Sequence, residues 1–335
     1  MNVSRGALLR ALIGIVISVV ALALAVRGVD LERSARVVGT AAPAWIGAML
    51  ACNLLDVAVR GARWQRLLAP IHRVRYRPML GYLLIGYLAN NVLPARLGEL
   101  VRSHYLGERE GVSRATTLGT VVVERVIDIA VVVLIASGAV VVLQARGLVA
   151  NAALVGLALA GLLVVALAVL LAAHRLPGAD RAMRLASRWP AVGDVARKLR
   201  GGLAVAGRSR TVGEAIALSL VAWTFSVLAF AAAGQAIGVE LSMGQAGLLS
   251  AGVALATAIP SGPGYLGTFE LAAVELGGTF GLAADPAFAI ALIVHAGILV
   301  VTSTGGAIAL LRFGWLRPTP AVASAQPAEG PVAGR

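Results

Sequence analysis

The sequence predicts an all-α polytopic membrane protein, a bundle of about six full spans plus two broken or re-entrant helical hairpins. Of its 335 residues, 59% are hydrophobic and 13% are charged, whereas soluble domains are about 45–50% apolar and about 25% charged. Apolar runs near the roughly 20 residues that a helix needs to cross a bilayer recur along the chain. Two further apolar runs are interrupted by prolines, glycines and charges.

The first apolar run, 11–26, follows Arg5 and Arg10. Because it is at or above the roughly 7–15 apolar residues of a signal peptide, and because more runs follow, we expect a retained span with its N-terminus inside. The continuous candidate spans are 8–26, 43–60, 116–143, 149–173, 212–237 and 285–312. The interrupted segments are 78–107, broken at Pro94, and 244–283, broken at Pro260 to Gly267.

Basic residues predict the orientation, because cytoplasmic loops of membrane proteins carry an excess of Lys and Arg. The connections 60–77 and 174–211 hold six and eight arginines, so both are expected in the cytoplasm. Segment 78–107 must then enter and leave on the cytoplasmic side, and segment 244–283 on the other. Both termini are expected in the cytoplasm, with the protein in the inner or plasma membrane. The loop after the first span, which this orientation places outside, contains three arginines (27, 33 and 36) and therefore disagrees with the rule.

Residues 174–211 mix arginines with Leu, Met, Trp and Val. This pattern predicts short amphipathic helices on the anionic inner leaflet, with Trp189 at the interface. The net charge of +13 therefore indicates a membrane surface, and no nucleic-acid partner is expected. The segment 316–335, rich in Pro, Ala and Gly, is expected to be a disordered tail. Residues 1–315 then form one transmembrane domain.

The two broken segments resemble each other. "NNVLPARLGEL" and "TAIPSGPGYLGTFEL" both run from apolar residues through a proline, with a glycine four residues later and then Glu-Leu. Entered from opposite faces, they would form an inverted repeat, which transporters use to build a binding site at the bilayer midplane. The alternative is a chance similarity between two short stretches.

The first break places irregular, polar backbone at membrane depth, which is tolerated only inside protein or beside a water-filled cavity. Pro94 removes a helix donor, and Gly98 lets the chain turn. Asn90 and Asn91 can bond the freed backbone groups or a lipid head group. The charges that follow are Arg96, Glu99 and Arg102. The alternative is an interfacial loop that ends a short helix.

The second break contains Gly262, Gly264 and Gly267. It is no P-loop, because Gly-Lys-Ser/Thr is missing. Its backbone N–H groups lead into a helix expected to start near Thr268, and such a start favours an anion such as a lipid phosphate. Glu270, in the first turn, would meet substrate or simply cap the helix.

The span 116–143 carries Glu124, Arg125 and Asp128 among valines. Each ionisable group at a membrane-helix centre costs about 2.5–3.5 kcal/mol, so these side chains must face the protein interior or a polar path. A structural pair that holds two helices together is the alternative. Asp56, with Arg60 one turn later, is a secondary candidate site.

Other chemistry is not expected. Cys52 is the one cysteine, which excludes a disulfide framework, and four histidines show no metal-ligand spacing. His295 is expected to be a core residue, not a proton relay. No metal, cofactor, nucleophilic triad or ATPase element is expected.

Three stretches identify a family resemblance: "RGARWQRLL" (60–68), "NNVLPARLGELVRSHYLGEREGVSRATTLGTVVVERVIDI" (90–129) and "AIPSGPGYLGTFE" (258–270). They resemble the membrane region of lysylphosphatidylglycerol synthases, a family that includes free-standing flippase-like proteins and some archaeal glycosylation proteins. The resemblance implies an all-α inner-membrane protein. In the synthases this region is associated with moving the aminoacylated lipid between leaflets.

The resemblance covers nearly the whole chain up to about residue 315. The family's motif residues map here onto Asn91, Pro94, Arg96, Gly98, Glu99, Glu124, Arg125, Asp128, Gly264, Gly267, Thr268 and Glu270. The chain ends in the tail where the synthases carry a soluble lysyl-transfer domain, so that reaction is not expected.

The leading functional hypothesis is a translocase for a lipid or lipid-linked head group, with membrane lipids as its partners. Arginines 96, 102 or 125 would meet the phosphate. The acids at 99, 124, 128 and 270 would meet a cationic or hydroxylated head group, or partner the arginines. The alternatives are a membrane-embedded lipid-modifying enzyme or partner subunit, and a small-solute or ion transporter. A separate lipid-modifying enzyme or a second copy of the chain are further possible partners.

Overall fold

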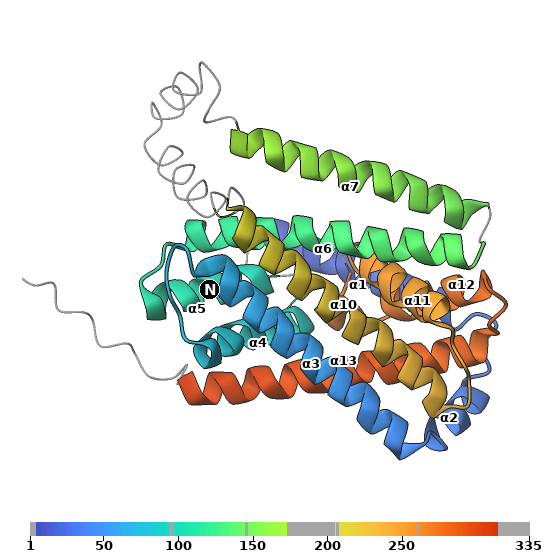
Figure 1. Cartoon of the computed structure of the whole chain (residues 1–335). Coiled ribbons are helices and arrows are strands. Elements are labelled where there is room, and N and C mark those ends of the chain that lie inside the picture. The colour runs from blue at the N-terminus through green and yellow to red at the C-terminus, as the bar shows by residue number, and fades with distance from the viewer. Residues whose placement is uncertain are drawn as a thin grey trace, which may run out of the picture.

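The computed structural model describes residues 5–93, 97–144, 147–172, 205, 208–259 and 261–313. Regular secondary structure within these residues is entirely helical (Figure 1). The helices are α1 (Arg5–Ala25), α2 (Leu31–Gly39), α3 (Pro43–Leu68), α4 (Tyr76–Val92), α5 (Gly98–Glu110), α6 (Arg114–Val142), α7 (Leu148–Ala172), α10 (Ser209–Ala236), α11 (Met243–Ala256), η4 (Pro263–Tyr265), α12 (Thr268–Gly278) and α13 (Ala284–Phe313). The predicted all-α polytopic fold is confirmed.

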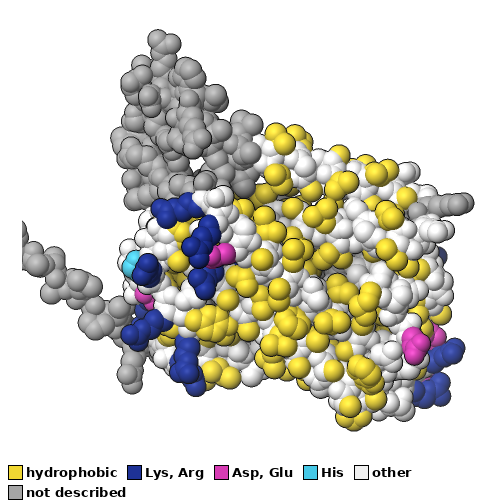
Figure 2. Space-filling view, in the orientation of Figure 1, with side chains coloured by type: hydrophobic (Ala, Val, Ile, Leu, Met, Phe, Trp, Pro, Cys, Tyr) yellow, Lys and Arg dark blue, Asp and Glu magenta, His cyan; other side chains and the backbone are white. Residues whose placement is uncertain are grey.

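Six of the described helices correspond to the six predicted spans. Four of them, α3, α6, α10 and α13, are long and apolar enough to cross a membrane. The described side chains of α1 and α7 add the shorter apolar stretches Leu12–Ala25 and Ala153–Val165. Figure 2 shows a face dominated by hydrophobic side chains between two ends where charges gather, as a bilayer requires.

One predicted boundary is wrong. The span predicted over 43–60 continues as α3 to Leu68, so three of the arginines counted as a cytoplasmic connection lie inside a helix. Trp64, Leu67 and Leu68 are completely buried in this extra length, so packing carries the helix onward. Arg63 is buried with them and faces carboxylates instead of lipid phosphates.

Local signals set several helix ends. Pro43 occupies the start of α3, where its missing N–H costs nothing. Ser242 and Gln245 form a reciprocal capping box at the start of α11. Gly111, with φ of 69°, ends α5 in the left-handed conformation that glycine adopts without strain.

The two interrupted segments form two hairpins of short helices, as predicted. Helices α4 and α5 have 17 and 13 residues, and α11 and α12 have 14 and 11. Each is shorter than the roughly 20 residues of a full span. Within each hairpin the two helices pack against one another. Pro94 and Pro260, which predicted the breaks, lie outside the described residues.

The helix packing has the pattern that an inverted repeat produces. Helices α3, α4, α5 and α6 correspond in this order to α10, α11, α12 and α13, and each substantial contact among these eight helices has a counterpart. For example, α4 packs on α13 as α11 packs on α6, and α3 packs on α13 as α10 packs on α6, while α3 and α10 pack along each other. The α4–α5 hairpin enters from one end of the bundle and the α11–α12 hairpin from the other (Figure 1). The packing therefore supports the repeat that the two short sequences indicated.

The described helix ends next to the connections predicted as cytoplasmic gather at one end of the bundle, with the α4–α5 hairpin (Figure 1). Nearly all of the predicted amphipathic segment 174–211, and the predicted tail 316–335, lie outside the described residues. Their predicted roles are therefore untested by the structure.

Candidate functional site

A cavity of about 230 Å³ lies where the two hairpins meet. Its lining comes from both halves of the molecule, from α3 to α6 and from α10 to α13. Its ionisable and amide side chains are Asn53, Asp56, Arg60, Tyr87, Asn90, Asn91, Glu99, Arg125 and Tyr265. Trp223, Phe230 and Phe269 supply aromatic surface. A cavity between membrane helices that is lined by charged and amide side chains can hold a hydrated or charged group.

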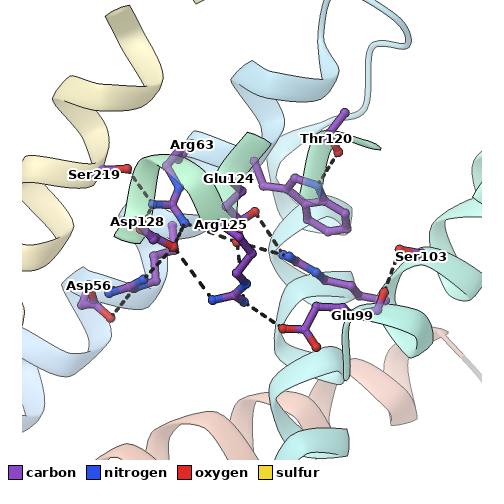
Figure 3. Close-up of polar contacts among 12 residues, drawn as sticks. Asp56, Arg63, Glu99, Ser103, Thr120, Glu124, Arg125, Asp128 and Ser219 are labelled. Carbon is purple, nitrogen blue, oxygen red and sulfur yellow. Dashed lines mark hydrogen bonds and ion pairs between the residues drawn. The ribbon is translucent and has the colours of Figure 1, made fainter. Parts of the chain in front are cut away.

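One wall of the cavity is continuous with a cluster of eight charged side chains on α3, α5 and α6 (Figure 3). We call it the charged cluster. Its arginines are Arg60, Arg63, Arg102 and Arg125, and its carboxylates are Asp56, Glu99, Glu124 and Asp128. Four positive and four negative charges cancel, so each buried ion has a partner, as membrane depth demands.

Arg63 holds the buried centre of the charged cluster and has 0% of its surface exposed. Its guanidinium donates to both oxygens of Asp128, at 2.9 Å for the Nη2–Oδ2 bond, and to the Ser219 hydroxyl at 2.6 Å. The Glu124 carboxylate is 3.3 Å away. Trp223 adds an indole N–H donor to Asp128 at 3.1 Å. These contacts join α3, α6 and α10.

Arg102 joins α5 to α6 in the same way. Its guanidinium donates to both oxygens of Glu124, at 3.1 and 3.3 Å, and lies 4.6 Å above the Trp64 ring. The side chain is 2% exposed. For the Arg63–Asp128 and Arg102–Glu124 pairs, the structure supports the alternative of ion pairs that hold helices together.

Two other pairs of the charged cluster face the cavity. Arg60 donates to both oxygens of Asp56 at 2.9 Å and lies over the Trp223 ring at 4.7 Å. Arg125 donates to Glu99 at 2.9 Å, and their side chains are 44% and 24% exposed. All four of these charged side chains line the cavity. They are the members that a bound molecule can reach.

The polar residues of the first break bond to protein. Asn90 Oδ1 accepts the Gly98 N–H at 2.7 Å, which satisfies one free donor at the start of α5. Asn91 donates to the hydroxyls of Thr302 and Ser303 on α13, at 2.8 and 3.0 Å. Both asparagines also line the cavity. Arg96, predicted to meet a phosphate, lies outside the described residues.

Gly98 allows the two helices of the first hairpin to touch. A Cβ at this position would lie 2.1 Å from the Gly86 carbonyl oxygen and 2.5 Å from Asn90 Oδ1. Any side chain there would therefore separate α4 from α5.

The second break differs from the predicted anion site. The Gly262 N–H donates to Ser18 Oγ at 2.8 Å, and the Gly267 N–H donates to Glu270 at 2.7 Å. These two predicted donors already have acceptors, and Glu270 caps α12, the alternative left open above. The Thr268 hydroxyl donates to the Tyr265 carbonyl at 2.9 Å.

Glu270 has a second partner in His295. Glu270 Oε1 lies 2.6 Å from His295 Nδ1, and Nε2 of the same ring lies 2.6 Å from the Gly264 carbonyl oxygen. The predicted burial of His295 is correct, at 3% exposed, but its polar partners were not foreseen.

Several residues of the site escaped prediction. The arginine count places Arg63 in a predicted loop, although its position three residues after Arg60 puts both on one helix face. In α10, a stripe of Ser219, Trp223 and Ser226 at helical spacing was the available signal. The described residues contain no group of three or more His, Cys, Asp or Glu that could hold a metal ion.

Comparison with known proteins shows which sequences the chain is similar to. The glycosyltransferase AglD of Haloferax volcanii is 29% identical to it over 135 residues. The match covers 40% of this chain and 22% of AglD, so the chain aligns with about a fifth of that relative. No solved structure shows a significant match. Residues 11–306 match the family model described as the lysylphosphatidylglycerol synthase TM region. The chain therefore belongs to the family of lysylphosphatidylglycerol synthase transmembrane regions.

Proposed function

We propose that the protein moves a phospholipid or lipid carrier between the leaflets of the cell membrane, with the head group passing through the polar cavity between the two hairpins. One observation carries this proposal. Two accessible ion pairs, Arg60–Asp56 and Arg125–Glu99, line a cavity at the meeting point of two oppositely inserted hairpins.

The chemistry of the cavity suits a head group with a phosphate. Arg60 and Arg125 can each exchange a carboxylate for a phosphate oxygen, because a guanidinium binds both in the same planar geometry. The released Asp56 and Glu99 can then accept an ammonium or hydroxyl group of the head group. With an ammonium head group such an exchange keeps every charge paired, and with a hydroxyl it keeps every carboxylate hydrogen-bonded, which limits the desolvation cost.

The cavity also sets which part of the lipid enters. Because its volume is only about 230 Å³, we expect the head group to enter it without the acyl chains. The chains would stay in the bilayer, against the hydrophobic outer surface (Figure 2). Inverted repeats support alternating access by movement of one repeat against the other. The head group would thereby meet one leaflet and then the other.

The test is reconstitution into vesicles that carry fluorescent anionic, zwitterionic, aminoacylated and polyprenyl-phosphate lipids. We expect leaflet exchange above empty vesicles for at least one class, with a fall of tenfold or more in Arg125→Met and Glu99→Gln. Arg66→Met is the matched control, because Arg66 is 62% exposed and does not line the cavity. The proposal fails if every lipid class exchanges at the rate of empty vesicles.

The similarity to AglD favours a second candidate, a membrane subunit or enzyme of a glycolipid pathway. In that case the carboxylates Asp56 and Glu99 would act as acid or base on a lipid carrier. Mass spectrometry of lipids after overexpression separates the two functions. A new lipid species that disappears in Glu99→Gln supports the enzyme, whereas unchanged species with altered leaflet distribution support transport.

A further inference from the structure

The Glu270–His295 pair lies outside the charged cluster and does not line the cavity. It joins α12 of the second hairpin to α13, and both side chains are nearly completely buried, at 2% and 3% exposed. Capping of α12 needs only one oxygen of Glu270, the one bonded to Gly267 N–H. Capping of α12 therefore does not explain the contact between Glu270 and His295.

The distances around the His295 ring limit where its hydrogens can lie. A backbone carbonyl oxygen can only accept, so His295 Nε2 must carry the hydrogen that bonds to Gly264. In a neutral ring Nδ1 is then a bare acceptor. A carboxylate is also only an acceptor, yet Nδ1 and Glu270 Oε1 are 2.6 Å apart. One further proton must lie between them, on either the ring or the carboxyl group.

We propose that Glu270 and His295 form a proton-binding site that couples lipid movement through the cavity to proton movement. The inference rests on the proposed function for the coupling, and on hydrogen-bond geometry for the proton. The occupied pair has no net charge, in either position of the proton. Loss of the proton leaves one negative charge, which is costly at membrane depth unless water or a cation reaches it.

The pair is connected to the cavity wall on both sides. Phe269, next to Glu270, lines the cavity and stacks on the His295 ring with ring centroids 4.3 Å apart. Tyr265, next to Gly264, lines the cavity as well. Without the proton the neutral ring has one hydrogen for two acceptors, so either Nδ1 faces Oε1 or Nε2 faces the Gly264 oxygen with no hydrogen between them. We expect this repulsion to shift the second hairpin against α13 and thereby to move two walls of the cavity.

Few other ionisable groups face this pair. Helix α11 has none, and α1 has none after Arg10. On α3 and α4, Asp56 and Tyr87 line the same cavity as Phe269. The remaining ionisable residues of the packed elements are Glu32, Arg33 and Arg36 of α2, Cys52, Arg60, Arg63 and Arg66 of α3, Tyr76, Arg77 and Tyr82 of α4, Arg210 and Glu214 of α10, Tyr265 of η4, Glu275 of α12, and Asp285 and Arg312 of α13. The bonds described for Glu270 and His295 join the two side chains to each other and to the backbone of Gly264 and Gly267.

The proton is tested first in the whole protein, without a transport assay. Replacing the other histidines (His72, His104 and His174) by Gln leaves His295 as the single source of ¹⁵N-histidine signals. At pH 7 we expect either a doubly protonated ring or a ring protonated at Nε2 beside a protonated carboxyl group, seen by infrared spectroscopy and absent from Glu270→Gln. A ring that carries one hydrogen, on either nitrogen, beside an ionised Glu270 at pH 7 overturns the proposal, whatever the transport result.

Coupling is tested in vesicles that hold the protein and a lipid that it exchanges. For one proton per lipid, a gradient of one pH unit can sustain a leaflet ratio of about tenfold. Glu270→Gln removes the titratable proton and keeps both hydrogen bonds, because its amide can donate to Nδ1 and accept from Gly267. We expect a gradient-dependent ratio in the parent protein and in Glu275→Gln, an exposed acid on the same helix, and a ratio of one in Glu270→Gln.

The outcomes separate the two proposals. A parent protein that exchanges lipid with no response to the pH gradient refutes the coupling and leaves the proposed function standing. A protonated pair in a protein that exchanges no lipid refutes the proposed function and with it the coupling, and leaves only the proton site.

Discussion

Substitution of Arg63 by Met should destabilise the folded protein by removing the centre of the charged cluster. Arg63 is completely buried and bonds to Asp128 and Ser219, with Glu124 at 3.3 Å. Removing one partner from a buried pair leaves an uncompensated charge and costs about 3–5 kcal/mol. At about 1.4 kcal/mol per factor of ten, the folding equilibrium constant falls by roughly two to four orders of magnitude. Reversible unfolding in mixed detergent and lipid micelles measures this change.

The charged cluster supplies its own control. Arg125→Met removes an arginine whose side chain is 44% exposed, and whose partner Glu99 is 24% exposed. Exposed pairs contribute about 0–1 kcal/mol, so this variant should lose little stability while it loses lipid exchange. In the double variant Arg63→Met with Asp128→Leu the charges balance again, and we expect part of the lost stability to return. Equal losses for Arg63→Met and Arg125→Met would refute the assignment of buried and accessible pairs.

Two further predictions concern the hairpin and the orientation. Gly98→Ala should lower the free energy of unfolding by about 1–3 kcal/mol or more, because the added Cβ would clash with the Gly86 backbone. Gly138→Ala is the control, because Gly138 has open space around it, and it should change the free energy of unfolding by at most about 1 kcal/mol. Equal melting temperatures for the two variants would contradict the close contact. In a Cys52→Ser background, cysteine at Arg73 should react with a membrane-impermeant reagent only from the cytoplasmic side, and cysteine at Arg27 only from the other. Reaction of both from one side would refute the orientation.

The sequence was most informative where membrane physics leaves few choices. Lipid offers no hydrogen bonds, so apolar run length predicted the long helices. Prolines and glycines inside such runs predicted both hairpins for the same reason. The acids Glu124 and Asp128 had to face protein, and the structure places both inside it.

Pairing between distant helices could not be predicted. Charge density marks cytoplasmic loops only when the arginines face water, and Arg63 instead faces carboxylates of α6, 61 and 65 residues away in the chain. The same limit hid the contact between Glu270 and His295, since no local pattern tells a capping carboxylate from one that also bonds a distant ring. The Gly262 N–H, predicted to be free at the second break, bonds to Ser18, an acceptor that only the tertiary structure supplies.

The equal numbers of positive and negative side chains in the charged cluster have an electrical consequence. A neutral site adds no gating charge of its own, so under the proposed function the charge that crosses the membrane in each cycle is that of the lipid and of any proton that accompanies it. An anionic lipid moving alone would do electrical work of about 2.3 kcal/mol for every 100 mV. A zwitterionic lipid, or an anionic lipid moving together with one proton, would cross without electrical work, and its exchange should not respond to the membrane potential.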